Sequence, residues 1–362
     1  ILTRQDGDGF PMTPAVTAFL SQTSWYIRTI DSAVAALEGI DRGAVLRVRE
    51  DGYLPPPLDG ARRRAAITSL GMHAYQQQLG PLTSSHRRSL MQSDAPLHFA
   101  FGDLGELEEA RYRASVMIAD LTQVVRDTVE GGFRLNAYAA SIVRDAQSFE
   151  CVRARLEGPA NLLDRWMDEI TDELWRSHRP DIVGLSVPFA GSAYGALRIA
   201  RRFRQVAPSV RIAMGGGWVN TSLRRLHDPG VFDYVDYITL DDGERPLQCL
   251  LELEEGTRSR DALLRTFVRR DGKVVYVSSA TEHDVPFRLS GTPTYAGLPL
   301  RRYLSYVPYL NAVWYPWRAR WNKLTLAHGC YWKKCAFCDV ALDYIGRYEP
   351  AGICLLYTSD AA

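Results

Sequence analysis

The sequence carries almost no net charge and contains few lysines. Its 43 basic and 42 acidic side chains leave a formal charge of +1, so no overall field attracts the chain to nucleic acid or to an anionic membrane. Only four of the basic residues are lysines, and the resulting excess of arginine carries no functional prediction. We therefore expect no nucleic-acid partner.

Long apolar runs, a signal peptide and lipidation motifs are also missing, which excludes a membrane-spanning or secreted protein from the expectations. The six cysteines do not form a disulfide framework, because three of them lie within nine residues and the rest are scattered. Together these absences predict a cytoplasmic protein in a reducing compartment, with no membrane partner.

The chain divides into segments of different pattern. Residues 1–150 are mostly helical in apolar spacing, and residues 151–290 alternate buried strands with amphipathic helices at short loop lengths. This alternation predicts an α/β domain with a doubly wound parallel sheet. We interpret residues 291–322 as a linker, 323–353 as the start of a further domain and 354–362 as a tail unrelated to what precedes it.

The loops after the three predicted strands are where a ligand is expected, because ligands of such sheets bind beyond the carboxyl ends of the strands. Three consecutive glycines there cost about 1 kcal/mol each in chain entropy and would allow a large flat ligand to lie against the backbone. A tight strand-to-helix turn is the alternative reason for them. No G-x-G-x-x-G sequence is present, which disfavours NAD and FAD. The candidate ligand-binding residues are Ser186, Val187, Pro188, Gly215, Gly216, Gly217, Gly243 and Glu244.

Cys330, Cys335 and Cys338 form a C-x4-C-x2-C motif. Thiolates bind both zinc and iron–sulfur clusters, and structural zinc needs four protein ligands. Three ligands to a four-iron cluster leave one iron open to a small molecule. The motif therefore favours a cluster, with zinc as the alternative if His328 supplies a fourth ligand.

Three stretches, "DIVGLSVPFAGSAYGALRIARRFR", "IAMGGGWVN" and "FDYVDYITLDDGERPL", together resemble the cobalamin-binding domain that precedes many radical S-adenosylmethionine enzymes. The cysteine motif follows in the expected order, and the resemblance covers about residues 160 to 353. It implies a cobalamin-binding domain of the Rossmann or flavodoxin kind followed by a partial (β/α) barrel. The strand-end residues given above would surround the cobalamin.

The same resemblance implies radical chemistry. A [4Fe-4S] cluster on the three cysteines would reduce S-adenosylmethionine to methionine and a 5′-deoxyadenosyl radical, with Phe337 beside the adenine. Radical methyl transfer from cobalamin is a further activity that the resemblance allows. The implied partners are a small-molecule or peptide substrate and an electron donor such as flavodoxin or ferredoxin.

The sequence departs from the family pattern in two places. The D-x-H-x-x-G loop, whose histidine binds cobalt from below, is absent, and four residues rather than the usual three separate the first two cysteines. Either cobalamin binds without a protein ligand to cobalt, or the domain keeps the fold without the cofactor. A zinc-stabilised binding module and a non-catalytic cobalamin carrier or sensor stay open as alternatives.

The last nine residues, 354–362, resemble the translation of a sequencing adaptor. On that interpretation the natural sequence of this chain stops near Ile353, and most of the barrel is missing. We expect the chain as given to be catalytically inactive.

Overall fold

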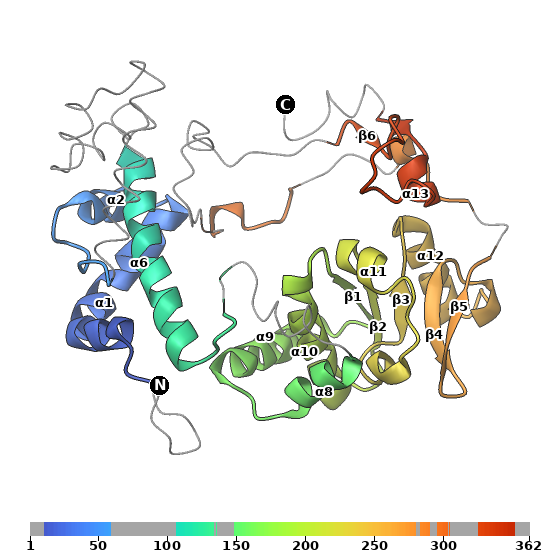
Figure 1. The fold of residues 1–362 in the computed structure, drawn as a ribbon, viewed down its shortest axis with the longest axis horizontal. Coiled ribbons are helices and arrows are strands. Elements are labelled where there is room, and N and C mark those ends of the chain that lie inside the picture. The colour runs from blue at the N-terminus through green and yellow to red at the C-terminus, as the bar shows by residue number, and fades with distance from the viewer. Residues whose placement is uncertain are drawn as a thin grey trace. The chain divides into compact units, whose positions relative to one another are not determined.

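The computed structural model describes residues 11–58, 106–133, 135, 148–279, 283–289, 295–302, 304 and 325–351 (Figure 1). The chain forms two compact units. The first unit comprises residues 1–131 with 295–323, and the second comprises 132–294 with 324–362. The predicted tail at 354–362 and most of the predicted linker at 291–322 lie outside the described residues.

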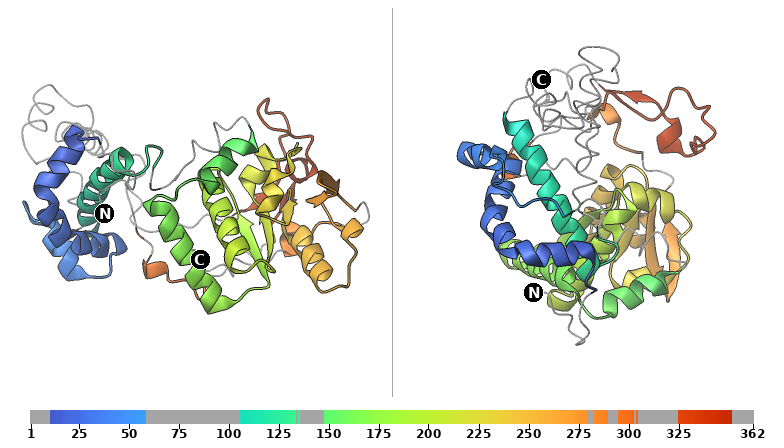
Figure 2. Two further views of the ribbon diagram at one scale, coloured as in Figure 1. Left: turned by 90° about the horizontal axis from the view of Figure 1, so that it is seen from below. Right: turned by 60° about the vertical axis from the view of Figure 1, so that its left-hand side comes forward.

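The described part of the first unit is built from three helices: α1 (Pro14–Glu38), α2 (Arg42–Arg49) and α6 (Glu106–Thr128). The hydroxyl of Thr13 caps α1 by accepting a hydrogen bond from the Val16 N–H, and Gly39 ends the helix at a φ of 74°. The three helices pack together in both views of Figure 2. Small side chains let them approach closely, and the core includes Ala33, Ala36, Ala110 and Ala114.

The second unit contains a five-stranded mixed sheet in the order β1-β2-β3-β4-β5. Its parallel part consists of β1 (Ile182–Ser186), β2 (Arg211–Gly215) and β3 (Tyr237–Thr239). The longer helices of this unit are α8 (Phe149–Glu157), α9 (Leu162–His178), α10 (Ala190–Val206), α11 (Gly217–Ser222) and α12 (Glu244–Glu254). A 3-10 turn at Pro229–Asp233 lies between α11 and β3.

Helices cover both faces of the sheet. Alternate strand residues point to opposite faces, so Ile212 and Met214 of β2 belong to one core together with Leu197 of α10. Ala213, between them, belongs to the core on the other face with Leu250 of α12. The predicted α/β class is therefore confirmed.

The predicted doubly wound parallel sheet is present only in part: the three predicted strands β1, β2 and β3 are parallel, but the whole sheet is mixed. The strands β4 (Thr266–Arg270) and β5 (Lys273–Val277) are antiparallel to their neighbours, and the strand order does not reverse within the described sheet. The two strands form a hairpin whose turn residues, Asp271 and Gly272, both have positive φ, at 48° and 73°. An Asp-Gly pair is a strong signal for such a turn, and it determines the antiparallel pairing.

Charged pairs join α9 to α10. Arg198 donates to both carboxylate oxygens of Asp168 at 2.9 and 2.5 Å, and Arg202 does the same to Asp172 at 2.7 and 2.6 Å. The apolar stripe of α10 predicts that its arginines point away from the core. For Arg198 this is wrong: only 3% of its side chain is exposed, because Asp168 and the carbonyl of Leu156 accept its hydrogen bonds.

Residues 325–351 carry the cysteine motif and contain only short elements. The strands β6 (Ala327–His328) and β7 (Glu349–Pro350) pair antiparallel, and α13 (Asp343–Gly346) is a single turn. A strand that opens a (β/α) barrel pairs in parallel with the next barrel strand. The pairing described within residues 325–351 is antiparallel, so these residues by themselves do not show a barrel.

None of the helices in the described ranges combines the length and the apolar character needed to cross a bilayer.

The burial of Arg198 predicts a large stability difference between two neighbouring arginines. Arg198→Ala leaves the Asp168 carboxylate and the Leu156 carbonyl without their donor, and we expect it to lower the free energy of unfolding by about 3 kcal/mol. Arg201→Ala removes a more exposed pair with Glu157 and should cost at most about 1 kcal/mol. Urea unfolding followed by circular dichroism measures both free-energy changes. Equal losses of stability in the two variants would contradict the buried, paired role given to Arg198.

Candidate functional site

The carboxyl ends of the three parallel strands lie at one edge of the sheet. Ser186, the last residue of β1, is in register with Gly215, the last residue of β2. The loop after β3 reaches the same edge, because the Asp241 N–H donates to Asn220 Oδ1 at 2.7 Å and Asn220 belongs to α11. The structure therefore brings together the three loops that the sequence singles out.

Gly216 has a φ of 107°, and its position is set by the chain itself. A Cβ at Gly216 would lie 2.8 Å from the backbone N and O of Val187. Two hydrogen bonds hold this close approach: the Val187 N–H donates to the Gly215 carbonyl at 2.7 Å, and the Trp218 N–H donates to the Val187 carbonyl at 3.0 Å. The glycine is therefore required by the tight strand-to-helix turn, one of the two reasons considered from the sequence.

The neighbouring glycines have similar reasons. A Cβ at Gly217 would lie 3.0 Å from the Pro188 carbonyl oxygen, and one at Gly215 would lie 2.8 Å from the hydroxyl of Thr239. The space that these three glycines keep free is filled by the chain's own atoms. They do not by themselves form a cradle for a corrin ring.

The outer surface of this edge is nevertheless open. Ser186, Pro188, Gly217, Gly243 and Glu244 are exposed, and a Cβ at Gly243 would meet nothing within 4 Å. Of the other predicted ligand-binding residues at this edge, Gly215 and Gly216 are half-buried and Val187 is fully buried. The aromatic side chain of Phe189, in the loop between β1 and α10, is 75% exposed. Most of these residues at the edge are therefore accessible to solvent.

The three cysteines of the motif are free thiols of intermediate exposure. The Cys330 N–H donates to the Ile345 carbonyl at 2.8 Å, and the Lys333 N–H lies 3.5 Å from the Cys330 sulfur as a donor. Lys333 adopts a φ of 53°, in the left-handed region of backbone conformation. Backbone donors to sulfur are one of the features that tune the potentials of iron–sulfur clusters.

The thiol and imidazole groups of this segment are suitable metal ligands, but they do not lie close together in the structure. Across the described ranges, no three Cys, His, Asp or Glu side chains lie close enough together to hold a metal ion. His328 places its Nε2 3.4 Å from an oxygen of Asp242, and its ring lies between those of Phe287 and Tyr344. The histidine proposed as a fourth zinc ligand is thus engaged elsewhere.

Phe337, the residue predicted to lie beside adenine, is 88% exposed. Tyr331 and Trp332 on the same loop are also exposed, and the Lys334 ammonium lies 5.8 Å from the Trp332 ring centroid. The aromatic side chains of the loop are therefore accessible from solvent.

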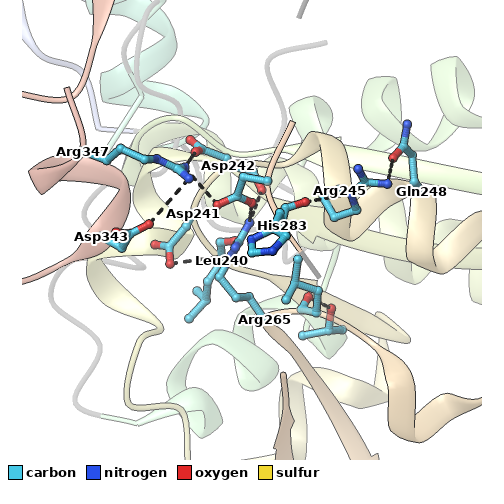
Figure 3. A network of polar contacts seen from close by, with 12 residues as sticks. Leu240, Asp241, Asp242, Arg245, Gln248, Arg265, His283, Asp343 and Arg347 are labelled. Atoms are coloured by element: carbon cyan, nitrogen blue, oxygen red, sulfur yellow. Dashed lines mark hydrogen bonds and ion pairs between the residues drawn. The ribbon is translucent and has the colours of Figure 1, made fainter. Parts of the chain in front are cut away.

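A network of arginines and carboxylates joins the cysteine-bearing segment to the sheet edge (Figure 3). Arg347 donates from one nitrogen to Asp242 at 3.2 Å and to Asp284 at 3.0 Å. Arg265 pairs with the other oxygen of Asp284 and donates to the Asp242 carbonyl at 3.0 Å. The sequence gives Asp242 as a strand-end residue but offers no signal for its partners.

Burial and charge act differently on the two carboxyl groups of this network. Burial raises the pKa of Asp242 above its ordinary value, with repulsion from Asp284 adding to it and attraction from His328 and Arg347 opposing it. Burial would also raise the pKa of Asp284. Hydrogen bonds and positive charge from Arg265 and Arg347 outweigh it, so the pKa of Asp284 is below its usual range. Asp284 is therefore the firmer anion of the pair.

Comparison of the chain with models of protein families, with curated proteins and with solved structures finds no match.

The close approach at Gly216 predicts that two glycines at this edge respond differently to substitution. Gly216→Ala combines a positive φ with a clash against Val187, and we expect it to cost about 2 kcal/mol or more in unfolding free energy. Gly243→Ala, at an open position, should change it by no more than about 0.5 kcal/mol. Thermal and urea unfolding measure both, and a neutral Gly216→Ala variant would contradict this view of the turn.

Proposed function

We propose that the chain is the cobalamin-domain portion and cluster loop of a radical S-adenosylmethionine enzyme. The observation that carries the proposal is the C-x4-C-x2-C motif of Cys330, Cys335 and Cys338, all three free thiols on one partly exposed segment. Three thiolates match a four-iron cluster with one open iron. A closed four-ligand zinc site is less consistent with that donor set.

When bound, such a cluster supplies the electron that cleaves S-adenosylmethionine to a 5′-deoxyadenosyl radical. The chain's own residues would hold the cluster and orient S-adenosylmethionine. Its three thiolates bind the metal, the Lys333 N–H donates toward the Cys330 sulfur, and the exposed ring of Phe337 offers a flat surface for adenine. Convergence of the three thiols on a cluster is part of the proposal.

The finer fold assignment belongs to the same proposal. We assign residues 151–290 to a cobalamin-binding-type domain and residues 323–353 to the opening of a partial (β/α) barrel. The exposed sheet edge around Ser186, Gly243 and Glu244 supports access for a large planar cofactor. Cobalamin would bind there without a histidine on cobalt, since no D-x-H-x-x-G loop is present.

The zinc-stabilised module is the weaker alternative. It needs a fourth ligand, and His328 instead faces Asp242 at 3.4 Å. The proposal for the whole enzyme also includes an electron donor such as flavodoxin or ferredoxin, a small-molecule or peptide substrate, and radical methyl transfer.

Reconstitution with iron and sulfide under anaerobic conditions tests the cluster. We expect about four iron and four sulfide ions per chain and a broad absorbance near roughly 400 nm. Cys335→Ala should lose most of both, because two thiolates cannot hold the cubane. The matched control is Cys151→Ala, which removes an exposed free thiol from α8 and should load like the wild type. Full iron loading of Cys335→Ala, or zinc in place of iron in protein purified without air, would contradict the proposal.

A corrinoid tests the sheet edge separately. The chain mixed with hydroxocobalamin and desalted should keep the corrin's visible absorbance. Gly243→Trp adds bulk at an open position of the edge and should abolish retention, whereas Gly131→Trp, at an open position of the first unit, should not. Equal retention by both variants would place the corrinoid elsewhere, and no retention by the wild type would favour a domain that keeps the fold without the cofactor.

A further inference from the structure

The cysteine-bearing segment, residues 325–351, contributes no buried residue to the second unit. Five of its larger apolar side chains are exposed, Leu326, Tyr331, Trp332, Phe337 and Tyr348, and Leu342, Tyr344 and Ile345 are only half-buried. A segment without a buried apolar anchor opens at low free-energy cost unless polar contacts hold it. The position of the cysteine loop must therefore depend mainly on its polar contacts with the sheet edge.

Arg347 makes the central one of these contacts. It reaches Asp242 of the loop after β3 and Asp284 of the segment before the 3-10 turn Phe287–Leu289 with a single nitrogen. Its other nitrogens lie 3.3 Å from Glu349 and 3.8 Å from Asp343, both on its own segment. The guanidinium thus joins two carboxylates of the α/β unit to two of the cysteine segment.

The carboxylates on the sheet side are firmly placed. The side chains of Asp284 and Asp242 are only 7% and 18% exposed, and Arg265 fixes both through Asp284 and the Asp242 backbone. Arg265 also donates to the Leu240 carbonyl at the end of β3. The end of β3 is therefore connected to Arg347 through hydrogen bonds and ion pairs of Arg265 and Asp284.

Secondary contacts support the same position. The Phe287 N–H donates to Glu349 at 2.7 Å, and Arg224 of the loop after α11 lies 5.6 Å from the ring of Tyr344. None of them joins as many charged groups as Arg347. Removal of Arg347 also leaves the largely buried carboxylate of Asp242 with less positive charge to offset the free-energy cost of its burial.

We propose that Arg347 is a latch that holds the cysteine segment on the carboxyl edge of the sheet, and that Asp242 is the residue shared by the two sites at that edge. A ligand that engages Asp242 or moves residues 241–244 would weaken the latch and free the cysteine loop. By linkage, ordering of the cysteine loop would strengthen the arrangement of residues 241–244. Naming these two sites as cobalamin and cluster sites rests on the proposed function; the latch itself does not.

Hydrogen exchange of the metal-free full chain tests the latch. Arg347→Ala should exchange peptides from residues 325–351 about tenfold faster than the wild type, while peptides of β2 and β3 keep their rates. The Cys330 amide, which donates to the Ile345 carbonyl, is the most direct reporter. The matched control is Arg245→Ala, because Arg245 lies in the same neighbourhood but donates to the His283 carbonyl and to Gln248.

Coupling between Arg347 and Asp242 separates a latch from a general loss of stability. Asp242→Asn alone should also speed exchange of the segment. Adding it to Arg347→Ala should have less effect than it has in the wild type, because the Arg347–Asp242 contact is already lost and only the His328–Asp242 contact is left to remove. Independent destabilising effects would multiply instead. The rate at which Cys330, Cys335 and Cys338 are alkylated is a second measure of how often the segment opens. Cys151 serves as the internal reference for an exposed thiol.

Unchanged exchange in Arg347→Ala would overturn the proposal, as would multiplying effects in the double variant. If Arg347→Ala loosens the whole unit, Arg347→Lys is used, since it keeps the charge but loses the planar fork. The latch predicts an intermediate rate for it, and a wild-type rate overturns the proposal. All these measurements use protein without metal, so their results do not depend on whether the cysteines bind iron.

Discussion

Three parallel strands that end at one edge force the loops leaving them to pass close to one another, and the second unit depends on this constraint. The closest approach is that of Gly216 to the Val187 backbone, fixed by hydrogen bonds of 2.7 and 3.0 Å. Because of it the turn after β2 and the end of β1 form one rigid surface. Asn220 ties the loop after β3 to the same surface. The candidate ligand edge is therefore preformed by backbone packing.

Attachment of the cysteine segment follows a different physical rule. The sheet is held by an apolar core on each face, whereas residues 325–351 meet it through Arg347, His328 and Glu349. Charged contacts are specific in direction but contribute modestly where water reaches them. A preformed edge and a separately anchored thiol segment suit a site in which two cofactors are held by different parts of one unit.

Much of the second unit could be predicted from local pattern. The strand at Ile182–Ser186 and the helices Leu162–His178 and Ala190–Val206 follow from apolar periodicity, and Asn161 and Asp164 form the capping box that starts α9. The hairpin of β4 and β5 was missed, although Asp271-Gly272 signals it. Arg198 was wrongly placed at the surface because periodicity cannot reveal that Asp168, 30 residues away, compensates its burial.

The candidate site was predictable only in part. The strand-end loops and the three cysteines carry their own signals, whereas Arg347 meets Asp284 and Asp242 across 63 and 105 residues of chain. No local pattern encodes contacts at such separations, and an arginine in a loop has many carboxylates within reach in principle. The reason for the three glycines could be found only in the structure. Their entropic cost is the same whether the space beside them is kept for a ligand or is filled by neighbouring backbone.

We propose that the three cysteines of one segment hold a four-iron cluster and leave one iron open to a small molecule. Mössbauer spectra of the chain reconstituted with iron-57, recorded without air before and after addition of S-adenosylmethionine, test it most directly. The account predicts a four-iron cluster in which the signal of a single iron site changes on addition. Spectra without such a cluster, or with every iron unaffected by S-adenosylmethionine, would contradict it.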